Sequence, residues 1–441
     1  MRLMQSDLQT LLLRDNPWLT DRESLSGWLR RYLPEPCLPR PSLDRARKRW
    51  RETNRAHLLV GPRQAGKSTA IWIHLAELGE PVLFLDCEQP LVRSWCASAP
   101  LFLADLEKWI HEPVALFFEE AQWLEEAGLF LKGLIDRKIG VPLLATGSSS
   151  FHLGARTRES LAGRATRSRL LPLALDEIVR PRDDEPRLTF EHRRASAFER
   201  HSIYGGYPEV WQTLRPEPLL TDLVEAIILR DASDLFHIQR PDAFRRLLGL
   251  AAGQSGNLVN FSEWAQILGI SRDTVASYLE ILQLGHVVVS LPPFAGGRRS
   301  ELTRSSKIYL VDNGIRNQVL HDFRPLEERT DSGAMLETWV FSELWKALPE
   351  GATLHYWRST SGAEVDFVVV RGEKVVGVEV KTQALRRPKL PRGSRSFLEA
   401  YRPEAFFMVH TGEPHHLNIE GNEVRWLAPW DLVEAVSNVF G

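Results

Sequence analysis

Four short apolar runs, each ending in small or acidic residues, alternate with helix-length stretches between residues 51 and 175. The runs read HLLVG from residue 57, PVLFLD from residue 81, VALFFEE from residue 114 and PLLATGS from residue 142. Runs of this length between turns are typical of strands that helices cover on both faces. The pattern therefore predicts a doubly wound α/β domain with a parallel sheet, whose ligands bind at the carboxyl ends of the strands.

The pattern changes on either side of this domain, which predicts further domains. Residues 1–50 contain two short helical patterns around a proline-rich break and form a helical lead-in. Residues 176–240 are mostly helical and suggest a helical lid. Residues 241–300 contain three compact helices and then an apolar strand, the order of a winged helix. Residues 301–441 return to strands and helices and form a second α/β unit.

Length, charge and cysteine content limit the number of domains, the possible partners and the compartment only in part. The 441 residues exceed what one hydrophobic core usually serves, which agrees with several domains. The formal net charge is -2, so any contact with nucleic acid must come from a locally basic face. The three cysteines form neither a zinc-binding nor an even disulfide pattern, which favours a reducing compartment, and we expect the cytoplasm. Since no uninterrupted apolar run reaches about 18 residues, we expect no membrane partner.

A glycine-rich loop, GPRQAGKST, lies between the first predicted strand and the helix that follows it. It matches the phosphate-binding pattern G-x-x-x-x-G-K-[ST] at every defined position. Glycines let backbone amides converge on phosphate oxygens, and the start of the helix adds the positive end of its dipole. The expected nucleotide-binding residues are Gly61, Pro62, Arg63, Gln64, Ala65, Gly66, Lys67, Ser68 and Thr69. Lys67 would reach the β- and γ-phosphates and act in catalysis, and Ser68 would bind Mg²⁺, which predicts a site for ATP with Mg²⁺.

Later strand ends offer groups for hydrolysis. Glu119 and Glu120 end an apolar strand, where Glu119 would hold Mg²⁺ and Glu120 would position the attacking water as a base; an ordinary acidic strand end is the alternative. Thr146 and Ser148 suit a sensor of the γ-phosphate, although such residues are often only helix caps. Arg164 could act in catalysis as an arginine finger on a neighbouring subunit's nucleotide, or be a solvated or DNA-facing side chain.

The helical triplet offers candidate DNA contacts. In SRDTVASYLEIL, Ser271 is expected to cap a recognition helix that turns Arg272, Thr274 and Ser277 outward. The basic loop that follows would place its arginines against phosphates; these are Arg298, Arg299 and Arg304. A structural linker or a protein-binding domain is the alternative, because winged helices also serve protein contacts.

The last domain combines acidic residues with a lysine. Glu337 lies on a predicted helix, Asp366 on a strand, and Glu379 and Lys381 two apart on the next strand, which resembles the PD-(D/E)XK nuclease pattern. The three carboxylates would bind Mg²⁺ and act with Lys381, which would orient or deprotonate the attacking water. The alternative is an inactive fold that keeps these acids as a surface network. Arg358 and Glu364 are expected to flank the site, or to be solvent-facing hairpin charges.

Together these motifs resemble a family of bacterial and archaeal AAA-type ATPases that pair a P-loop domain with a C-terminal domain of unknown function, DUF4143. The resemblance covers most of the chain and rests on NPWL, GPRQAGKST, FFEEAQ, TGSSS, SLAGR, YGGYPEV, SKIYLVDNG, YWRSTSGAEVDFVV and VEVKT. It implies phosphate and Mg²⁺ binding by Lys67 and Ser68, and a sensor at Thr146. Glu119 departs from the aspartate that family members generally carry, which puts the rate of hydrolysis in question more than binding.

The expected fold class is α/β, with a P-loop AAA-like domain in residues 51–175, a helical lid, a winged-helix domain and a C-terminal α/β domain similar to restriction endonucleases. The expected function is an ATPase that acts on DNA and cleaves it with Mg²⁺, working as a homo-oligomer if the nucleotide lies at a subunit boundary. Two alternatives stay open. One is an ATP-switched regulatory or interaction protein with an inactive nuclease-like domain, and the other is a transport or metabolic kinase, against which the additional domains argue.

Overall fold

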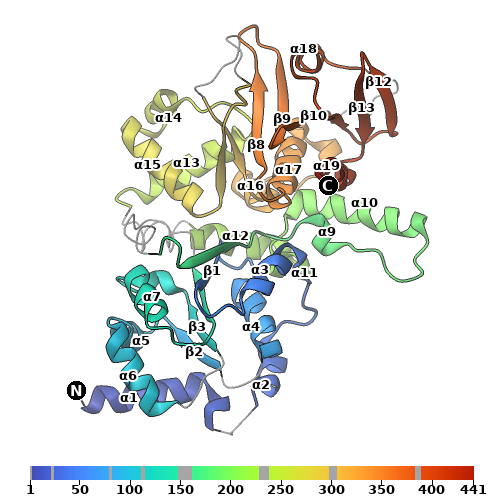
Figure 1. Cartoon of the computed structure of the whole chain (residues 1–441). Coiled ribbons are helices and arrows are strands. Elements are labelled where there is room, and N and C mark those ends of the chain that lie inside the picture. Colours follow the sequence, from blue (N-terminus) through green and yellow to red (C-terminus); the bar gives the residue numbers. More distant parts are fainter. Residues whose placement is uncertain are drawn as a thin grey trace. The chain divides into compact units, whose positions relative to one another are not determined.

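The computed structural model describes residues 2–20, 24–78, 82–110, 115–147, 161–227, 238–296, 305–382 and 389–441. The chain divides into two compact units, Met1–Leu171 and Pro172–Gly441 (Figure 1). The first unit therefore ends shortly before the predicted boundary at residue 175. No helix within these ranges combines the length and the apolar character that crossing a bilayer requires.

The first unit is built on a parallel sheet of five strands in the order β2-β3-β4-β1-β5. The strands are β1 Ala56–Val60, β2 Val82–Asp86, β3 Ala115–Glu119, β4 Leu143–Gly147 and β5 Ala165–Arg169. The first four are the predicted apolar runs, whereas β5 reads ATRSR and has no apolar run that could have revealed it. Because all strands are parallel, the carboxyl ends of β1, β4 and β3 lie side by side along one edge of the sheet.

Helices cover both faces of this sheet. Leu58 and Phe118 pack on one face against α1, α5, α6 and α7, and Leu59 and Phe117 pack on the other face against α2, α3 and α4. The bounds are α1 Arg2–Asp15, α2 Leu25–Tyr32, α3 Asp44–Arg49, α4 Lys67–Leu78, α5 Pro90–Trp95, α6 Ala99–Trp109 and α7 Ala127–Asp136. The structure confirms the α/β class and the parallel sheet.

The predicted helical lead-in is part of this unit, and the NPWL motif attaches it to the edge strand β2. The Asn16 amide donates to the Phe84 carbonyl at 3.0 Å and accepts from the Phe84 N–H at 2.6 Å. Trp18 Nε1 donates to the Val82 carbonyl at 2.7 Å. These bonds satisfy backbone groups that an edge strand would otherwise leave without a partner strand.

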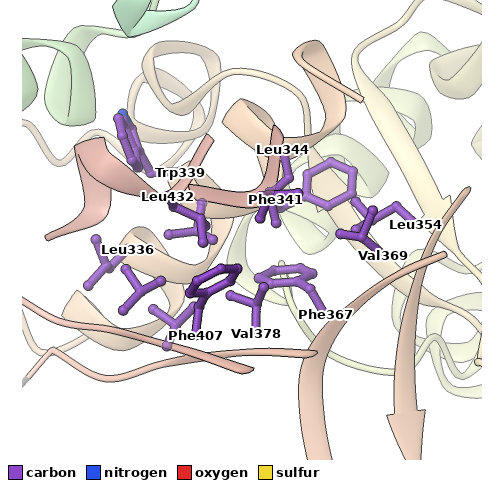
Figure 2. Packing of buried hydrophobic residues seen from close by; sticks show 14 of the residues in the cluster. Leu336, Trp339, Phe341, Leu344, Leu354, Phe367, Val369, Val378, Phe407 and Leu432 are labelled. Atoms are coloured by element: carbon purple, nitrogen blue, oxygen red, sulfur yellow. The ribbon is translucent and has the colours of Figure 1, made fainter. Parts of the chain in front are cut away.

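The second unit contains a mixed sheet of six strands in the order β12-β13-β11-β10-β9-β8. The strands are β8 Thr353–Arg358, β9 Glu364–Arg371, β10 Lys374–Val380, β11 Ala405–Val409, β12 His415–Ile419 and β13 Asn422–Leu427. Helices α17 (Ser332–Lys346) and α19 (Leu432–Phe440) cover one face, and α18 (Arg392–Tyr401) covers the other. Figure 2 shows the first of these cores, where Phe341 and Leu344 of α17 lie over Phe367 and Val378 of the sheet.

The helices predicted as a lid belong to the second unit. They are α9 Leu175–Ile178, α10 Arg187–Tyr204, α11 Pro208–Gln212 and α12 Pro216–Ala226. Leu175 and Phe198 share the core of the C-terminal sheet, and the ring of Phe198 meets that of Trp339 edge-on at 4.8 Å. Apolar residues of α9 and α10 thus pack in the same core as α17, whereas Leu220 and Leu223 of α12 pack in the core that contains α13.

A compact helical group with a two-stranded antiparallel sheet precedes the C-terminal sheet. Its elements are α13 Pro241–Gly253, α14 Phe261–Leu268, α15 Arg272–Leu284, β6 Val288–Leu291 and β7 Lys307–Leu310, with α16 Asn313–Leu320 packed against α13. Ser271 caps α15 by accepting from the Thr274 N–H at 3.0 Å, and Arg272 and Ser277 are exposed, as predicted. Because β7 pairs with β6, the predicted boundary at residue 300 separates two paired strands. Arg298, Arg299 and Arg304 lie outside the described residues.

Candidate functional site

The P-loop occupies the turn between β1 and α4. Gly66 has φ 91°, a conformation that only glycine adopts without strain. A Cβ atom at Gly61 would lie 1.9 Å from the Leu170 carbonyl oxygen, which leaves no room for a side chain. The loop thus leads directly into the first turn of α4. The loop consists of Gly61, Pro62, Arg63, Gln64, Ala65 and Gly66, and the turn begins with Lys67, Ser68 and Thr69. The glycines stand where the loop conformation requires them.

Lys67 is buried, and its ammonium is held by the loop itself. Its Nζ donates to the Gly61 carbonyl at 3.1 Å and to the Pro62 carbonyl at 2.9 Å. Lys67 starts α4 and folds back over the loop. Its ammonium therefore lies next to the place where the phosphates of a nucleotide would bind. The ammonium can exchange these carbonyl contacts for phosphate oxygens.

Ser68 and Glu119 meet across the gap between α4 and β3. Their side chains are hydrogen-bonded, and the pKa of Glu119 is raised to about 7, first by burial and then by the charges of Glu120 and Asp86. The Ser68 hydroxyl and the charge of Lys67 act in the opposite direction. A buried carboxyl with a raised pKa beside a hydroxyl fits a hard cation such as Mg²⁺, which favours the charged carboxylate.

Glu120 follows β3 in a left-handed conformation with φ 50°. Its N–H donates to the Thr146 Oγ1 at 3.0 Å, and its carboxylate accepts from the side-chain amide of Gln122. Thr146 is buried at the end of β4, next to the end of β1. The structure therefore brings Lys67, Glu120 and Thr146 to one edge of the sheet. Ser148 lies outside the described residues.

Thr146→Val is expected to slow ATP hydrolysis roughly tenfold, because the hydrogen bond that fixes the Glu120 backbone is worth about 1 kcal/mol. The affinity for ATP should stay within about threefold, since the loop and Lys67 are untouched. Phosphate release under saturating ATP measures the first effect and calorimetry the second. Thr146→Ser keeps the hydroxyl and should retain most of the rate, whereas equal loss in both variants would count against this role.

Arg164 lies at the opposite edge of the same sheet, where the amino ends of the strands lie. It directly precedes β5, and its carbonyl accepts from the Ala56 N–H at the start of β1. Its guanidinium pairs with Asp136 at 2.6 Å. A strand of five residues spans roughly 16 Å, so Arg164 does not reach the P-loop of its own chain. The structure thus does not join Arg164 to the other predicted residues.

Arg40 contacts the P-loop and was not expected from the sequence. Its guanidinium donates to the Ala65 carbonyl at 3.0 Å and to the Leu171 carbonyl at 2.5 Å. Its neighbours form the proline-rich break, where no periodicity indicates a role. Only the folded path of the lead-in reveals that this arginine supports the loop.

The second unit gathers acidic residues from three elements. Glu337 comes from α17, Asp366 from β9, and Glu379 from β10, with Lys381 directly after that strand. Lys381 Nζ lies 2.6 Å from Glu379 Oε1, and the Val380 N–H donates to Asp366 Oδ2 at 2.8 Å. We call Glu337, Glu364, Asp366 and Glu379 the acidic cluster.

Burial shifts the titration of this cluster. It raises the pKa of Glu337 to about 7 and that of Glu379 to about 8, and it also raises the pKa of Asp366. In each glutamate the charge of Asp366 adds to the effect of burial. The Glu379 Oε2 atom is buried without a hydrogen-bond partner. Hard oxygen donors suit a divalent cation, and Asp366 and Glu379 are the residues that could hold one.

Glu337 contacts a tyrosine and a lysine, whereas the sequence predicted it as a metal ligand. Its Oε1 accepts from the Tyr309 hydroxyl at 2.5 Å and lies 3.4 Å from Lys307 Nζ, so this atom faces β7. In the part of the chain that the structure describes, no three acidic, histidine or cysteine side chains form a ready set of metal ligands. The three predicted ligands are thus not preassembled, because lysine and tyrosine side chains contact the carboxylates.

The residues predicted to flank the site have distinct roles. Glu364 belongs to the cluster through Lys307, whose Nζ lies 2.5 Å from Glu364 Oε1. Arg358 Nε lies 3.7 Å from the other oxygen of Glu364 at the rim. Sequence reasoning missed Lys307 and Tyr309, although both lie in the motif SKIYLVDNG.

Several known proteins are similar to this chain. An uncharacterized protein of Mycobacterium tuberculosis is 29% identical over 386 residues, which are 86% of this chain and 81% of that protein. An uncharacterized protein of Haemophilus influenzae is 21% identical over 402 residues, which are 87% of this chain and 96% of that protein. Among solved structures, a Walker-type ATPase of Pyrococcus abyssi aligns with a TM-score of 0.43 at 16% identity, covering 65% of this chain and 97% of that one.

Family models match three consecutive regions. Residues 195–325 match a domain of unknown function, DUF8612, and residues 332–430 match another, DUF4143. Residues 53–179, which contain the P-loop, match the model described as AAA domain. The matches thus find an AAA-type ATPase domain in the first part of the chain, followed by two domains whose functions the models leave open.

Proposed function

We propose that the chain is an Mg²⁺-dependent ATPase that acts on DNA. One observation supports the proposal most strongly: a single edge of the parallel sheet gathers Lys67, the Ser68–Glu119 pair, Glu120 and Thr146. ATP hydrolysis needs groups that hold phosphates, bind a metal ion and orient water, and this edge offers one of each.

The loop and the start of α4 would bind the triphosphate. Backbone amides and the helix dipole attract the phosphates, and Lys67 would leave the Gly61 and Pro62 carbonyls for β- and γ-phosphate oxygens. Ser68 and Glu119 would hold Mg²⁺, which neutralises negative charge on the phosphates during transfer. The nine residues from Gly61 to Thr69 form this binding site.

Glu120 would act on the attacking water. At the end of the strand, its carboxylate would accept the proton of a water that attacks the γ-phosphate. Thr146 accepts from the Glu120 N–H, so its own hydroxyl hydrogen stays available for that water or for a phosphate oxygen.

The second unit would contact and cleave DNA. The helices α13, α14 and α15 with β6 and β7 have the order of a winged helix, and the exposed Arg272 and Ser277 of α15 could meet a DNA groove. In a nuclease-like C-terminal domain, Asp366 and Glu379 would hold Mg²⁺, which activates water and stabilises charge on the phosphate. Lys381 would orient or deprotonate that water.

A homo-oligomer would complete the nucleotide site. Arg164 lies at the sheet edge opposite to the P-loop, where it pairs with an exposed aspartate that a competing phosphate could replace. A neighbouring copy could therefore offer its Arg164 to the nucleotide of this chain. ATP, DNA and a second copy of the chain are the partners in this proposal.

Lys381→Ala and Asp366→Ala are expected to lower Mg²⁺-dependent DNA cleavage at least about 10²-fold, since each removes a group from the reacting centre. Digestion of plasmid DNA with Mg²⁺ and ATP measures this effect. Lys374→Ala, at the exposed start of β10, is the matched control and should leave cleavage unchanged. Cleavage that survives both substitutions would sink the nuclease proposal.

A DNA-binding assay and an assay of phosphoryl transfer, each with and without DNA, separate the alternatives. An unaltered chain that binds DNA in an ATP-dependent manner but never cuts it supports a regulatory module with an inactive nuclease-like domain. Phosphoryl transfer to a small acceptor that does not respond to DNA would support a kinase.

A further inference from the structure

Lys307 is an ammonium group buried inside the acidic cluster. The residue is 4% exposed, and its Nζ lies 2.5 Å from Glu364 and 3.4 Å from Glu337. It also lies 5.6 Å above the ring of Tyr356. Lysine is almost never buried to this degree unless it is paired, so these carboxylates are what hold it there.

The backbone of Lys307 is fixed on both sides. Lys307 pairs with Leu291 of β6 on one side and forms an isolated bridge with Leu258 on the other. Pairing on both sides fixes the backbone position from which the side chain starts. The ion pairs with Glu364 and Glu337 then hold the ammonium in the cluster.

The carboxylate of Glu337 is held next to Lys307 by a hydrogen bond from Tyr309. The Tyr309 hydroxyl, two residues along the same strand, donates to the Glu337 oxygen that faces Lys307. A Cβ atom at Gly256 would lie 3.1 Å from this oxygen, so only a glycine there leaves the carboxylate its position without crowding. Two carboxylates thus face the buried ammonium of Lys307, Glu364 at 2.5 Å and Glu337 at 3.4 Å.

The charges of the cluster leave room for one divalent ion. Its four carboxylates face three cationic groups, Lys307, Lys381 and Arg358, which leaves one negative charge when every group is ionised. One divalent cation more than balances this charge, so a second one would leave an excess of positive charge. The uncovered acceptor is Glu379 Oε2, whereas Glu379 Oε1 pairs with Lys381 and the printed ion pairs of Lys307 are to Glu337 and Glu364.

We propose that Lys307 takes the place of a second cation and thereby limits the acidic cluster to a single divalent ion, bound at Asp366 and Glu379. Lys307 is then a positioning residue that keeps Glu337 and Glu364 out of the metal's coordination shell. This inference rests on the metal site of the proposed function.

Counting bound Mn²⁺ by equilibrium dialysis of the full chain tests the inference. Lys307→Met removes the charge and keeps most of the length of the side chain, and we expect it to bind one Mn²⁺ more per chain than the unaltered protein. Lys307→Arg keeps the charge and should bind the same number as the unaltered protein. The difference between variants cancels any ion at the nucleotide site. An unchanged count in Lys307→Met would overturn the inference.

Two further measurements separate the possible failures. If Asp366→Ala binds as many Mn²⁺ ions as the unaltered chain, the proposed metal site itself is wrong. If Lys307→Met does not fold, anomalous scattering from Mn²⁺-soaked crystals of the unaltered chain decides. One peak beside Asp366 and Glu379 supports the inference, and a second peak on Glu337 or Glu364 refutes it.

Discussion

Lys67→Ala is expected to weaken ATP binding roughly tenfold to a hundredfold and to reduce hydrolysis by about 10²-fold or more. A hydrogen bond to a charged group is worth about 1.5–3 kcal/mol, and each 1.4 kcal/mol is about tenfold in affinity. The larger effect on hydrolysis follows because the ammonium also stabilises charge that develops in the transition state. Lys67 donates to the Gly61 and Pro62 carbonyls of the loop itself, and we expect the substitution to leave the fold intact.

Calorimetry with a non-hydrolysable ATP analogue and a phosphate-release assay measure the two parts of this prediction. Lys108→Ala is the matched control, because Lys108 is an exposed lysine of α6 in the same unit. The control should bind and hydrolyse ATP like the unaltered chain. Normal ATP binding and hydrolysis by Lys67→Ala would show that the P-loop is not the ATP site.

Glu120→Gln is expected to lower ATP hydrolysis by about 10²- to 10³-fold while the affinity for ATP stays within about threefold. General base catalysis contributes about 10²- to 10⁴-fold, and glutamine cannot accept the proton. The size of the side chain and the backbone bond from residue 120 to Thr146 are both kept. The variant should therefore trap ATP in an unreacted state.

Single-turnover hydrolysis and nucleotide binding test this separation of binding from chemistry. Glu125→Gln, five positions further along and exposed, is the control and should turn over normally. If Glu120→Gln hydrolyses ATP at the usual rate while Glu119→Gln does not, the base is Glu119 and the two carboxylates exchange roles.

The nucleotide site could be predicted because its parts are local. The loop from Gly61 to Thr69 is one continuous motif, and Glu119, Glu120 and Thr146 each end an apolar run whose direction follows from a parallel sheet. The order β2-β3-β4-β1-β5 places these ends together, and the pattern of the runs alone does not contain that order. Arg40 was missed because it reaches the loop from a segment without periodic pattern.

The second unit was harder to predict because its contacts join distant segments. β7 pairs with β6, although residues 292–306 separate them in the sequence, and composition alone does not reveal that a boundary at residue 300 divides two paired strands. The segment predicted as a lid looks like an independent helical region until Phe198 is seen to pack on Trp339. Lys307 and Tyr309 look like ordinary strand residues, and only their distances to Glu337 place them in the acidic cluster.

Phosphate release from ATP by the unaltered full chain tests the central claim most directly. The account predicts release that saturates with ATP, requires Mg²⁺, stops on chelation and continues for many turnovers per chain. A folded chain that binds ATP with Mg²⁺ and releases no phosphate, either alone or with DNA, would contradict it.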